Sequence, residues 1–407
     1  MPRIYKKDYE DEDNDYSNYD ENDYEDHKYD DKKKYNDNGF ERSEFVTSEG
    51  LTVSFQHCDK RTQDRCGCYE DDCRPSIVLL HGTGYDSNYW LCLMKKLCKV
   101  ANVFAIDNLG AGESDTPNTG SLTLARLTQN LTEFLNELNL DKVYLVGHGI
   151  GGLIALNFSI LYPNRVVKIA VSSVNPRYFP LPGSTWTYFI SPELQQLVTQ
   201  ALLPGANLQT LAPIIANLID PVDCEGKERL ADQYINYIEQ YRLYVPALQT
   251  IDFRTLASQV TVPVLIMEGT RDPLVPVGAA NFLRTNITNS ALVEFYGQGS
   301  NFPILNTGLY NKTVFNFFFV KCDPCCAFFE TIDEVEEDED ECEYICQEYS
   351  KNYEHKHKKE KKNDCGCYEK KDKKKEKKDK CGCNKKSKYD DHEFNYKNKI
   401  VIPCRYT

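Results

Sequence analysis

The segment that most limits the fold of this chain is VYLVGHGIGGLIAL, at residues 143–156. It begins with β-branched and aromatic residues, which favour a buried strand. A glycine-dense turn follows, and an apolar run with helical spacing comes directly after it. Glycine lets a chain turn tightly and adopt backbone angles that are closed to other residues. The segment therefore predicts a strand that turns at once into a helix.

The same alternation of apolar strands and amphipathic helices recurs on both sides of this segment. The predicted strands lie in 77–84, 103–107, 143–147, 166–173, 262–276 and 291–297. The predicted helices lie in 88–100, 121–140, 150–163, up to about 285 and near 305–320. Continuous apolar runs are typical of strands in a parallel sheet that is covered on both faces. We therefore predict an α/β fold: a mostly parallel central sheet with helices on both faces.

One long segment interrupts this alternation. Residues 176–250 are helical in pattern and aromatic, with no clear strand, and we predict that they form an inserted helical cap.

Composition divides the chain into three parts. Residues 1–42 are rich in Asp, Glu, Asn and Tyr, whereas 43–320 are rich in Val, Leu, Ile and Phe. Residues 321–407 contain cysteines, an acidic run and then a Lys-rich block. Segments that bury little apolar surface cannot offset the entropy of an ordered chain. We therefore predict one domain at 43–320 between two disordered, charged tails.

The net charge of −14 conceals a separation of charge along the chain. The Lys-rich block either binds an acidic partner or is attracted to the acidic run beside it. It contains almost no Arg and few aromatic residues, so we expect no sequence-specific nucleic-acid binding. The first residues have no apolar core, and no apolar run is long enough to span a membrane, which predicts an intracellular, cytoplasmic protein. The style of the tails resembles that of proteins from A+T-rich genomes such as large DNA viruses.

The chain has 17 cysteines, and the tripeptide CGC occurs at 66–68, 365–367 and 381–383. One cluster precedes the first strongly apolar strand and consists of Cys58, Cys66, Cys68 and Cys73. Four thiolates can hold a tetrahedral zinc ion, but the C-x-C spacing departs from the usual zinc patterns. A disulfide, which requires an oxidising setting, and low-complexity drift are the other interpretations. We treat the cluster as a weak metal candidate and predict no cofactor.

Four motifs occur in a fixed order along the domain: LLHGTG, AIDNLGAGESD, VGHGIGG and MEGTRDPLVP. Together with the interruption after the fourth apolar strand, they resemble the α/β-hydrolase superfamily, in its capped form, over about 43–320. In that family a G-x-S-x-G turn presents a nucleophilic serine. The resemblance implies that Gly149 stands at the nucleophile position, and glycine has no atom that could attack a carbonyl.

The resemblance also implies an oxyanion hole, in which backbone amides stabilise negative charge. Its donors would be the amides of Thr83, which follows Gly82 in the H-G-x motif, and of Ile150. His81 in the same motif is expected to be a buried histidine, hydrogen-bonded within the turn.

Asp272 matches the acid position of the family's catalytic triad, where it would orient a histidine. Its neighbour Pro273 allows a second interpretation, an N-cap with proline at the first helical position. The resemblance places the histidine within SNFPILN at 300–306, where this chain has Asn301. None of the seven histidines lies between residues 149 and 354. His148 precedes Gly149 on the strand, so we expect its side chain to pack beneath the end of the sheet, away from the site.

Three functions remain open at this point. The first is a catalytically degenerate hydrolase-like protein that binds a small acyl, ester-like or hydrophobic ligand or acts as a scaffold. The second is an active serine-type esterase with an unrecognised triad; Ser172, Ser173 and Ser300 lie near the site but are expected to have no histidine partner. The third is an assembly protein that acts through its charged tails.

Overall fold

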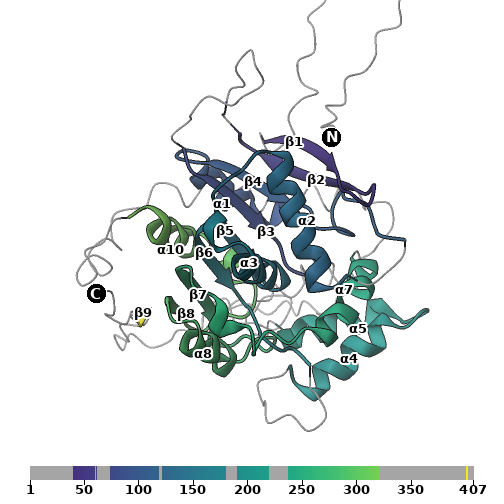
Figure 1. Ribbon diagram of the computed structural model, residues 1–407. Coiled ribbons are helices and arrows are strands. Elements are labelled where there is room, and N and C mark those ends of the chain that lie inside the picture. The colour runs from purple at the N-terminus through teal and green to yellow at the C-terminus, as the bar shows by residue number, and fades with distance from the viewer. Residues whose placement is uncertain are drawn as a thin grey trace, which may run out of the picture.

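The computed structural model describes residues 40–59, 61, 74–118, 122–179, 190–219, 237–320 and 400–401. Their strands form one nine-stranded sheet in the order β1-β2-β4-β3-β5-β6-β7-β8-β9 (Figure 1). The strands are β1 (Glu41–Val46), β2 (Thr52–His57), β3 (Ser76–Leu80), β4 (Asn102–Ile106), β5 (Val143–His148), β6 (Val166–Ser172), β7 (Val264–Gly269), β8 (Ser290–Phe295) and β9 (Ile400–Val401). Strands β3 to β8 pair in parallel, which confirms the predicted α/β class with a mostly parallel sheet.

Helices lie between the strands and after them. They are α1 (Leu91–Leu97), α2 (Leu124–Glu137), α3 (Ile150–Leu161), α4 (Pro192–Leu202), α5 (Leu208–Ile219), α7 (Ile238–Thr250), α8 (Val277–Asn286), α9 (Phe302–Leu305) and α10 (Thr307–Phe319). Short 3₁₀ turns occur at η2 (Ser87–Trp90), η3 (Pro163–Arg165) and η4 (Ala257–Gln259). Helix α2 starts where the Thr123 side chain accepts a hydrogen bond from the Arg126 amide, which is an N-cap.

Two apolar cores cover the two faces of the sheet. Because side chains alternate along a strand, Val78 and Leu80 of β3 face one core, while Ile77 and Leu79 face the other. Helices α2, α3 and α8 pack on the first face, and α1 and α10 pack on the second. The continuous apolar runs in the sequence therefore reflect strands that are buried on both sides.

The first two strands extend the parallel sheet with an antiparallel hairpin. Glu41 of β1 pairs with His57 of β2, and β2 in turn pairs with β4. The sequence had assigned Glu41 and Arg42 to the acidic tail, so that boundary is corrected to a strand start at Glu41. The charge of Arg42 is accommodated because its guanidinium reaches a buried carboxylate, as described below.

The segment between β6 and β7 contains α4, α5 and α7 in its described part, at the position predicted for the cap (Figure 1). Three aromatic cap residues that could either fill the pocket or leave it open, Trp186, Tyr188 and Phe189, lie outside the described residues. So does most of the tail sequence, although Ile400 and Val401 of β9 pair with β8. In the part of the chain that the structure describes, no helix is long and apolar enough to cross a membrane.

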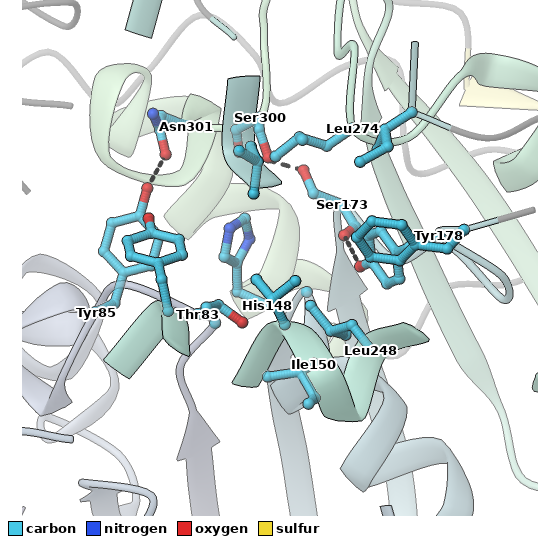
Figure 2. Close-up of a pocket in the computed structure, with 17 residues that line it drawn as sticks. Thr83, Tyr85, His148, Ile150, Ser173, Tyr178, Leu248, Leu274, Ser300 and Asn301 are labelled. Atoms are coloured by element: carbon cyan, nitrogen blue, oxygen red, sulfur yellow. Dashed lines mark hydrogen bonds between the residues drawn. The ribbon is translucent and has the colours of Figure 1, made fainter. Parts of the chain in front are cut away.

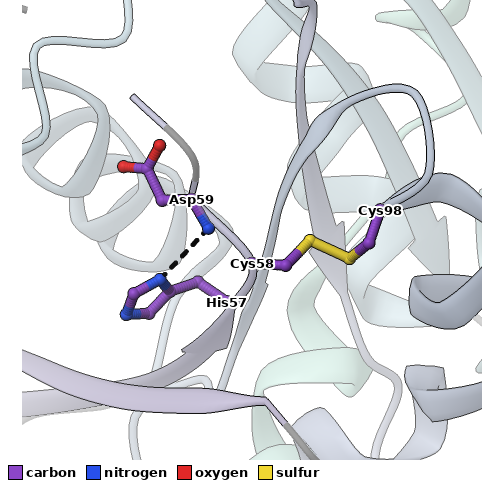
Figure 3. The surroundings of a disulfide bond; sticks show 4 residues. All are labelled: His57, Cys58, Asp59 and Cys98. Atoms are coloured by element: carbon purple, nitrogen blue, oxygen red, sulfur yellow. Dashed lines mark hydrogen bonds between the residues drawn. A yellow bond between two sulfur atoms is a disulfide. The ribbon is translucent and has the colours of Figure 1, made fainter. Parts of the chain in front are cut away.

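A disulfide joins Cys58, just after β2, to Cys98 at the end of α1, with 6.1 Å between the Cα atoms (Figure 3). This corrects the metal interpretation for Cys58, because its thiol is bonded to a cysteine outside the predicted cluster. The other members, Cys66, Cys68 and Cys73, lie outside the described residues. Disulfides persist in oxidising compartments, so this bond does not favour the cytoplasmic location expected from the sequence.

Candidate ligand-binding site

A pocket of about 100 Å³ lies at the carboxyl ends of the parallel strands, between the sheet and the cap (Figure 2). This is the edge at which open α/β sheets bind ligands. The residues that line it are Gly82, Thr83, Tyr85, His148, Gly149, Ile150, Ser173, Tyr178, Phe179, Ile190, Val198, Tyr241, Val245, Leu248, Leu274, Ser300 and Asn301. They come from loops after β3, β5, β6, β7 and β8 and from cap helices α4 and α7.

Gly149 lies between β5 and α3 with φ +53° and ψ −118°. Its amide donates to the Ser172 carbonyl at 2.9 Å, which holds the turn against β6. A φ in this region strains any residue with a Cβ atom. Space is available nonetheless: a Cβ at this position would lie 3.7 Å from Gly82 Cα and 3.9 Å from the Tyr178 hydroxyl oxygen. The turn thus has the shape of a nucleophile elbow and room for a side chain that it does not carry.

The two amides proposed for the oxyanion hole belong to residues that line this pocket. Ile150 is the first residue of α3, where backbone N–H groups lack partners within the helix and the helix dipole favours negative charge. Thr83 lines the same pocket from the loop after β3. At Gly82, next to it, a Cβ would come within 2.7 Å of His148 Cδ2, so a larger residue there would have to displace the His148 ring.

His81 is buried and held within its own turn, as expected. Its Nε2 accepts from the Asn108 amide at 3.0 Å, so its Nδ1–H donates to the Gly82 carbonyl at 2.8 Å. Burial lowers the pKa of His81, which keeps the ring neutral. The ring therefore supports the loop and has no free nitrogen with which to act as a base.

Asn301 lies in the pocket wall immediately before α9 and is 3% exposed. Its Oδ1 accepts a hydrogen bond from the hydroxyl of Tyr85, which also lines the pocket (Figure 2). The place at which the resemblance puts a histidine is thus taken by a neutral amide paired with a phenol.

Asp272 is buried behind the pocket, next to two of its lining residues. Its Oδ1 accepts from the amides of Leu274 at 2.8 Å and Val275 at 3.2 Å, and its carboxylate also contacts the Ser173 hydroxyl. The N-cap interpretation is wrong, because α8 starts only at Val277. Asp272 instead closes the turn over 272–275, because its side chain accepts hydrogen bonds from backbone amides within that turn.

Sequence reasoning missed Glu268, the neighbour of Asp272. Glu268 is fully buried at the end of β7 and hydrogen-bonded to the Asp272 carboxyl group. Burial, and next the negative charge of Asp272, raise the pKa of Glu268 well above its usual range. The only signal in the sequence was an acidic residue inside the apolar run VLIMEG.

His148 is buried, as expected, but the expectation that it points away from the site is wrong. Its ring lines the pocket and stacks on Tyr89 with 5.0 Å between ring centroids. Strand alternation failed here because β5 ends at His148 and the chain turns at the next residue. Burial, and then the charge of His81, lower the pKa of His148 to about 3, so the ring is neutral at physiological pH.

The expectation that the nearby serines lack a histidine partner is wrong for Ser172. Its Oγ lies 3.2 Å from His148 Nδ1 and 3.4 Å from the Tyr310 hydroxyl oxygen. Ser172 is fully buried, however, and does not line the pocket. Ser173 does line it, with an unusual φ of +49° for a non-glycine residue, and its Oγ donates to the Ser300 carbonyl at 3.2 Å.

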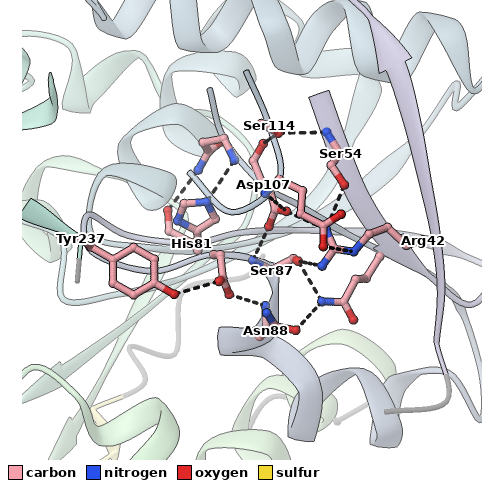
Figure 4. A network of polar contacts seen from close by, with 12 residues as sticks. Arg42, Ser54, His81, Ser87, Asn88, Asp107, Ser114 and Tyr237 are labelled. Atoms are coloured by element: carbon pink, nitrogen blue, oxygen red, sulfur yellow. Dashed lines mark hydrogen bonds and ion pairs between the residues drawn. The ribbon is translucent and has the colours of Figure 1, made fainter. Parts of the chain in front are cut away.

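A buried polar network supports the loop that carries Thr83 (Figure 4). Arg42 reaches from β1 to Asp107, with 2.7 Å between Nη1 and Oδ2. Asp107 in turn accepts from the Ser87 amide at 2.6 Å. Burial, and then the charge of Asp107, raise the pKa of the neighbouring Asp86 to about 6. The tail-proximal strand β1 thus supplies the cation that balances acidic groups beside the pocket loop.

Comparison with known proteins agrees with this architecture. Residues 75–213 match the family described as alpha/beta hydrolase fold. An enol-lactonase from Burkholderia xenovorans LB400 superposes with a TM-score of 0.54 at 22% identity, over 66% of this chain and 97% of that one. An esterase from Exiguobacterium antarcticum superposes with a TM-score of 0.57 at 18% identity, over 67% and 98%. The described domain has the α/β-hydrolase fold.

The individual proteins that are similar in sequence to this chain are named for different roles. The "Karrikin insensitive 2 receptor IA" of Petunia hybrida is 25% identical over 237 residues, which cover 57% of this chain and 85% of the relative. A probable esterase of Oryza sativa subsp. japonica is 28% identical over 242 residues, covering 58% and 87%. The similar sequences thus include one named as a receptor and one named as an esterase.

Proposed function

We propose that this chain binds a small uncharged molecule in the pocket above Gly149 and does not hydrolyse it. The observation that carries this proposal is the composition of the pocket centre. Gly149 offers no side-chain atom for attack, and the Asn301 amide cannot transfer a proton near neutral pH. The amides of Thr83 and Ile150 depend on backbone shape alone, so they remain able to hold an oxygen atom of a ligand.

The chemistry of the walls supports an uncharged ligand. No Asp, Glu, Lys or Arg occurs among the described residues that line the pocket, and His148 is neutral. Burying a charged ligand group there would cost its hydration without a compensating partner. Apolar contacts come from both the core and the cap, for example from Ile150 and Leu248. A volume of about 100 Å³ suits a molecule of a few non-hydrogen atoms.

An active serine-type esterase is the alternative, and the names of several relatives favour it. It would require Ser172 to act with His148, or Ser173 to act with Asp272. Ser172 lies beneath the pocket floor, and the Ser173 hydroxyl is directed to Ser300 and Asp272. Ser172 thus has a histidine partner but does not line the pocket, whereas Ser173 lines the pocket and its hydroxyl donates to the Ser300 carbonyl.

The test is hydrolysis of 4-nitrophenyl acetate, together with labelling by a fluorophosphonate that reacts with activated serines. We expect the wild type to match buffer in rate and to remain unlabelled. Turnover well above buffer that Asp272→Asn abolishes would overturn the proposal, and loss of that turnover in Ser172→Ala or Ser173→Ala would identify the serine. A gain of labelling in the double variant Gly149→Ser, Asn301→His would support an inherited elbow geometry.

A further inference from the structure

Helix α7 and Tyr237, the residue just before it, carry long polar side chains that reach the loops beneath the cap. They recur at intervals of three and four residues, which places them on one side of a helix. These residues are Tyr237, Gln240, Tyr241 and Tyr244. The Tyr237 hydroxyl donates to Asp86 Oδ2 at 3.1 Å, and the Tyr244 hydroxyl donates to the Leu109 carbonyl at 2.7 Å.

Gln240 makes the most direct contact with the pocket loop. Its side chain is 4% exposed, and its Oε1 accepts from the Gly84 amide. Its Nε2 donates to the Tyr85 carbonyl at 2.9 Å. One planar amide thus pairs with a donor and an acceptor on adjacent residues, immediately after Thr83. Both bonds are buried, so breaking them leaves polar backbone groups without water.

The same loop is shaped to receive this helix. Gly84 has φ +84°, and the hydroxyl end of Tyr241 occupies the space that a Cβ at residue 84 would need. The helix therefore packs directly on the backbone of the loop. Helix α7 also forms part of the pocket wall, through Val245 and Leu248. Helix α7 therefore both forms part of the pocket wall and holds the loop after β3.

We propose that Gln240 is a positioning residue for ligand binding: it holds the loop so that the Thr83 amide can donate to a carbonyl oxygen bound above Gly149. This role rests on the proposed function and narrows the ligand to small uncharged carbonyl compounds. Gln240 itself does not line the pocket. Its effect on a ligand is therefore transmitted through the backbone of residues 83–85.

The test compares two rings that differ only in a carbonyl group, γ-butyrolactone and tetrahydrofuran. Dissociation constants are measured by NMR titration for the wild type, Gln240→Leu and Gln240→Glu, with the exposed Gln129→Leu as control. We expect the wild type and the control to bind the lactone more tightly than the ether. In Gln240→Leu we expect lactone affinity to fall about three- to tenfold, the range for one lost hydrogen bond, while ether affinity stays unchanged.

Gln240→Glu keeps an acceptor for the Gly84 amide, but when ionised it places a carboxylate oxygen instead of a donor beside the Tyr85 carbonyl, so its effect should have the same sign. Gln240→Glu also provides a second measurement if Gln240→Leu does not fold. Equal losses for both rings, or an unchanged preference for the lactone, would overturn the role of Gln240 while leaving the proposed function intact. Failure of the wild type to bind either ring would overturn the proposed function and this role with it.

Discussion

Glu268, at the end of β7, contacts the carboxyl group of Asp272 behind the wall of the pocket. Glu268 Oε2 and Asp272 Oδ2 have no other hydrogen-bond partner among the described residues, and both side chains are buried. Two carboxylates in contact cannot both be ionised at reasonable cost, so one stays protonated. Burial raises the pKa of both groups, and the charge of Asp272 raises the pKa of Glu268 further, so we expect Glu268 to carry the proton. In the family resemblance, Asp272 would bind a histidine; here a neutral acid from the same strand contacts it.

This pair predicts a pH dependence of stability. The pKa of Glu268 is higher in the folded chain than its ordinary value of 4.5, so its contribution is fully present below pH 4.5. That contribution is lost as pH rises toward the folded pKa. Gln at position 268 keeps a donor for Asp272 but does not titrate. We therefore expect Glu268→Gln to be close to the wild type in unfolding free energy at pH 4.5 and increasingly more stable up to pH 8.

The measurement is urea unfolding at several pH values, with the exposed Glu193→Gln as the matched control. Asp86 has a pKa of about 6 and is unchanged by the substitution, so the difference between variant and wild type reports on the Glu268–Asp272 pair. A difference that does not change with pH would show that Glu268 and Asp272 do not hold a shared proton.

A substitution at Gly149 should strain the backbone without causing a steric clash. Its φ of +53° penalises any Cβ, whereas no atom lies closer than 3.7 Å to the place that a Cβ would take. We expect Gly149→Ala to fold and to lose about 1–3 kcal/mol in unfolding free energy. Gly205→Ala is the matched control, since Gly205 has φ +78° in open space. A loss at 149 far beyond that at 205 would indicate a clash and contradict the room described at the elbow.

Gly151 predicts a much larger effect two residues further on. A Cβ here would overlap the carbonyl oxygens of Leu80 and His81, because α3 packs directly on the end of β3. Neither partner can yield, since both contacts are with backbone. We expect Gly151→Ala to be more destabilising than Gly149→Ala although its φ is not in the left-handed region. Chemical denaturation of the two variants side by side decides the order, and the reverse order would contradict this packing.

The disulfide predicts sensitivity to reductant. Cys58 and Cys98 are separated by 40 positions, and closing a loop of that length stabilises the folded chain by about 4 kcal/mol in the chain-entropy model. We expect a reductant to lower the melting temperature of the wild type by several degrees. The double variant Cys58→Ser, Cys98→Ser should start from the lower value and not respond further at this bond. Equal melting temperatures for the wild type with and without reductant would argue against the bond.

Local signals in the sequence predicted most of the architecture. Hydrophobic periodicity located the six parallel strands and the helices between them, because strands and helices repeat at different intervals. The boundaries were less accurate: β1 begins inside the expected tail, and the last predicted helix is divided into α9 and α10. The sequence around Arg42 does not indicate its ion pair with Asp107, which lies 65 positions further along the chain.

The sequence by itself determined that residue 149 has no nucleophile and that no histidine lies between residues 149 and 354. These are facts of composition and do not depend on folding. Only the tertiary structure decided that Glu268 contacts Asp272, that Cys58 bonds to Cys98, that His148 faces the pocket and that Gln240 holds the backbone at Gly84. Such relationships join residues through sheet order and cap packing, or depend on where a strand ends, and hydrophobic periodicity does not encode them.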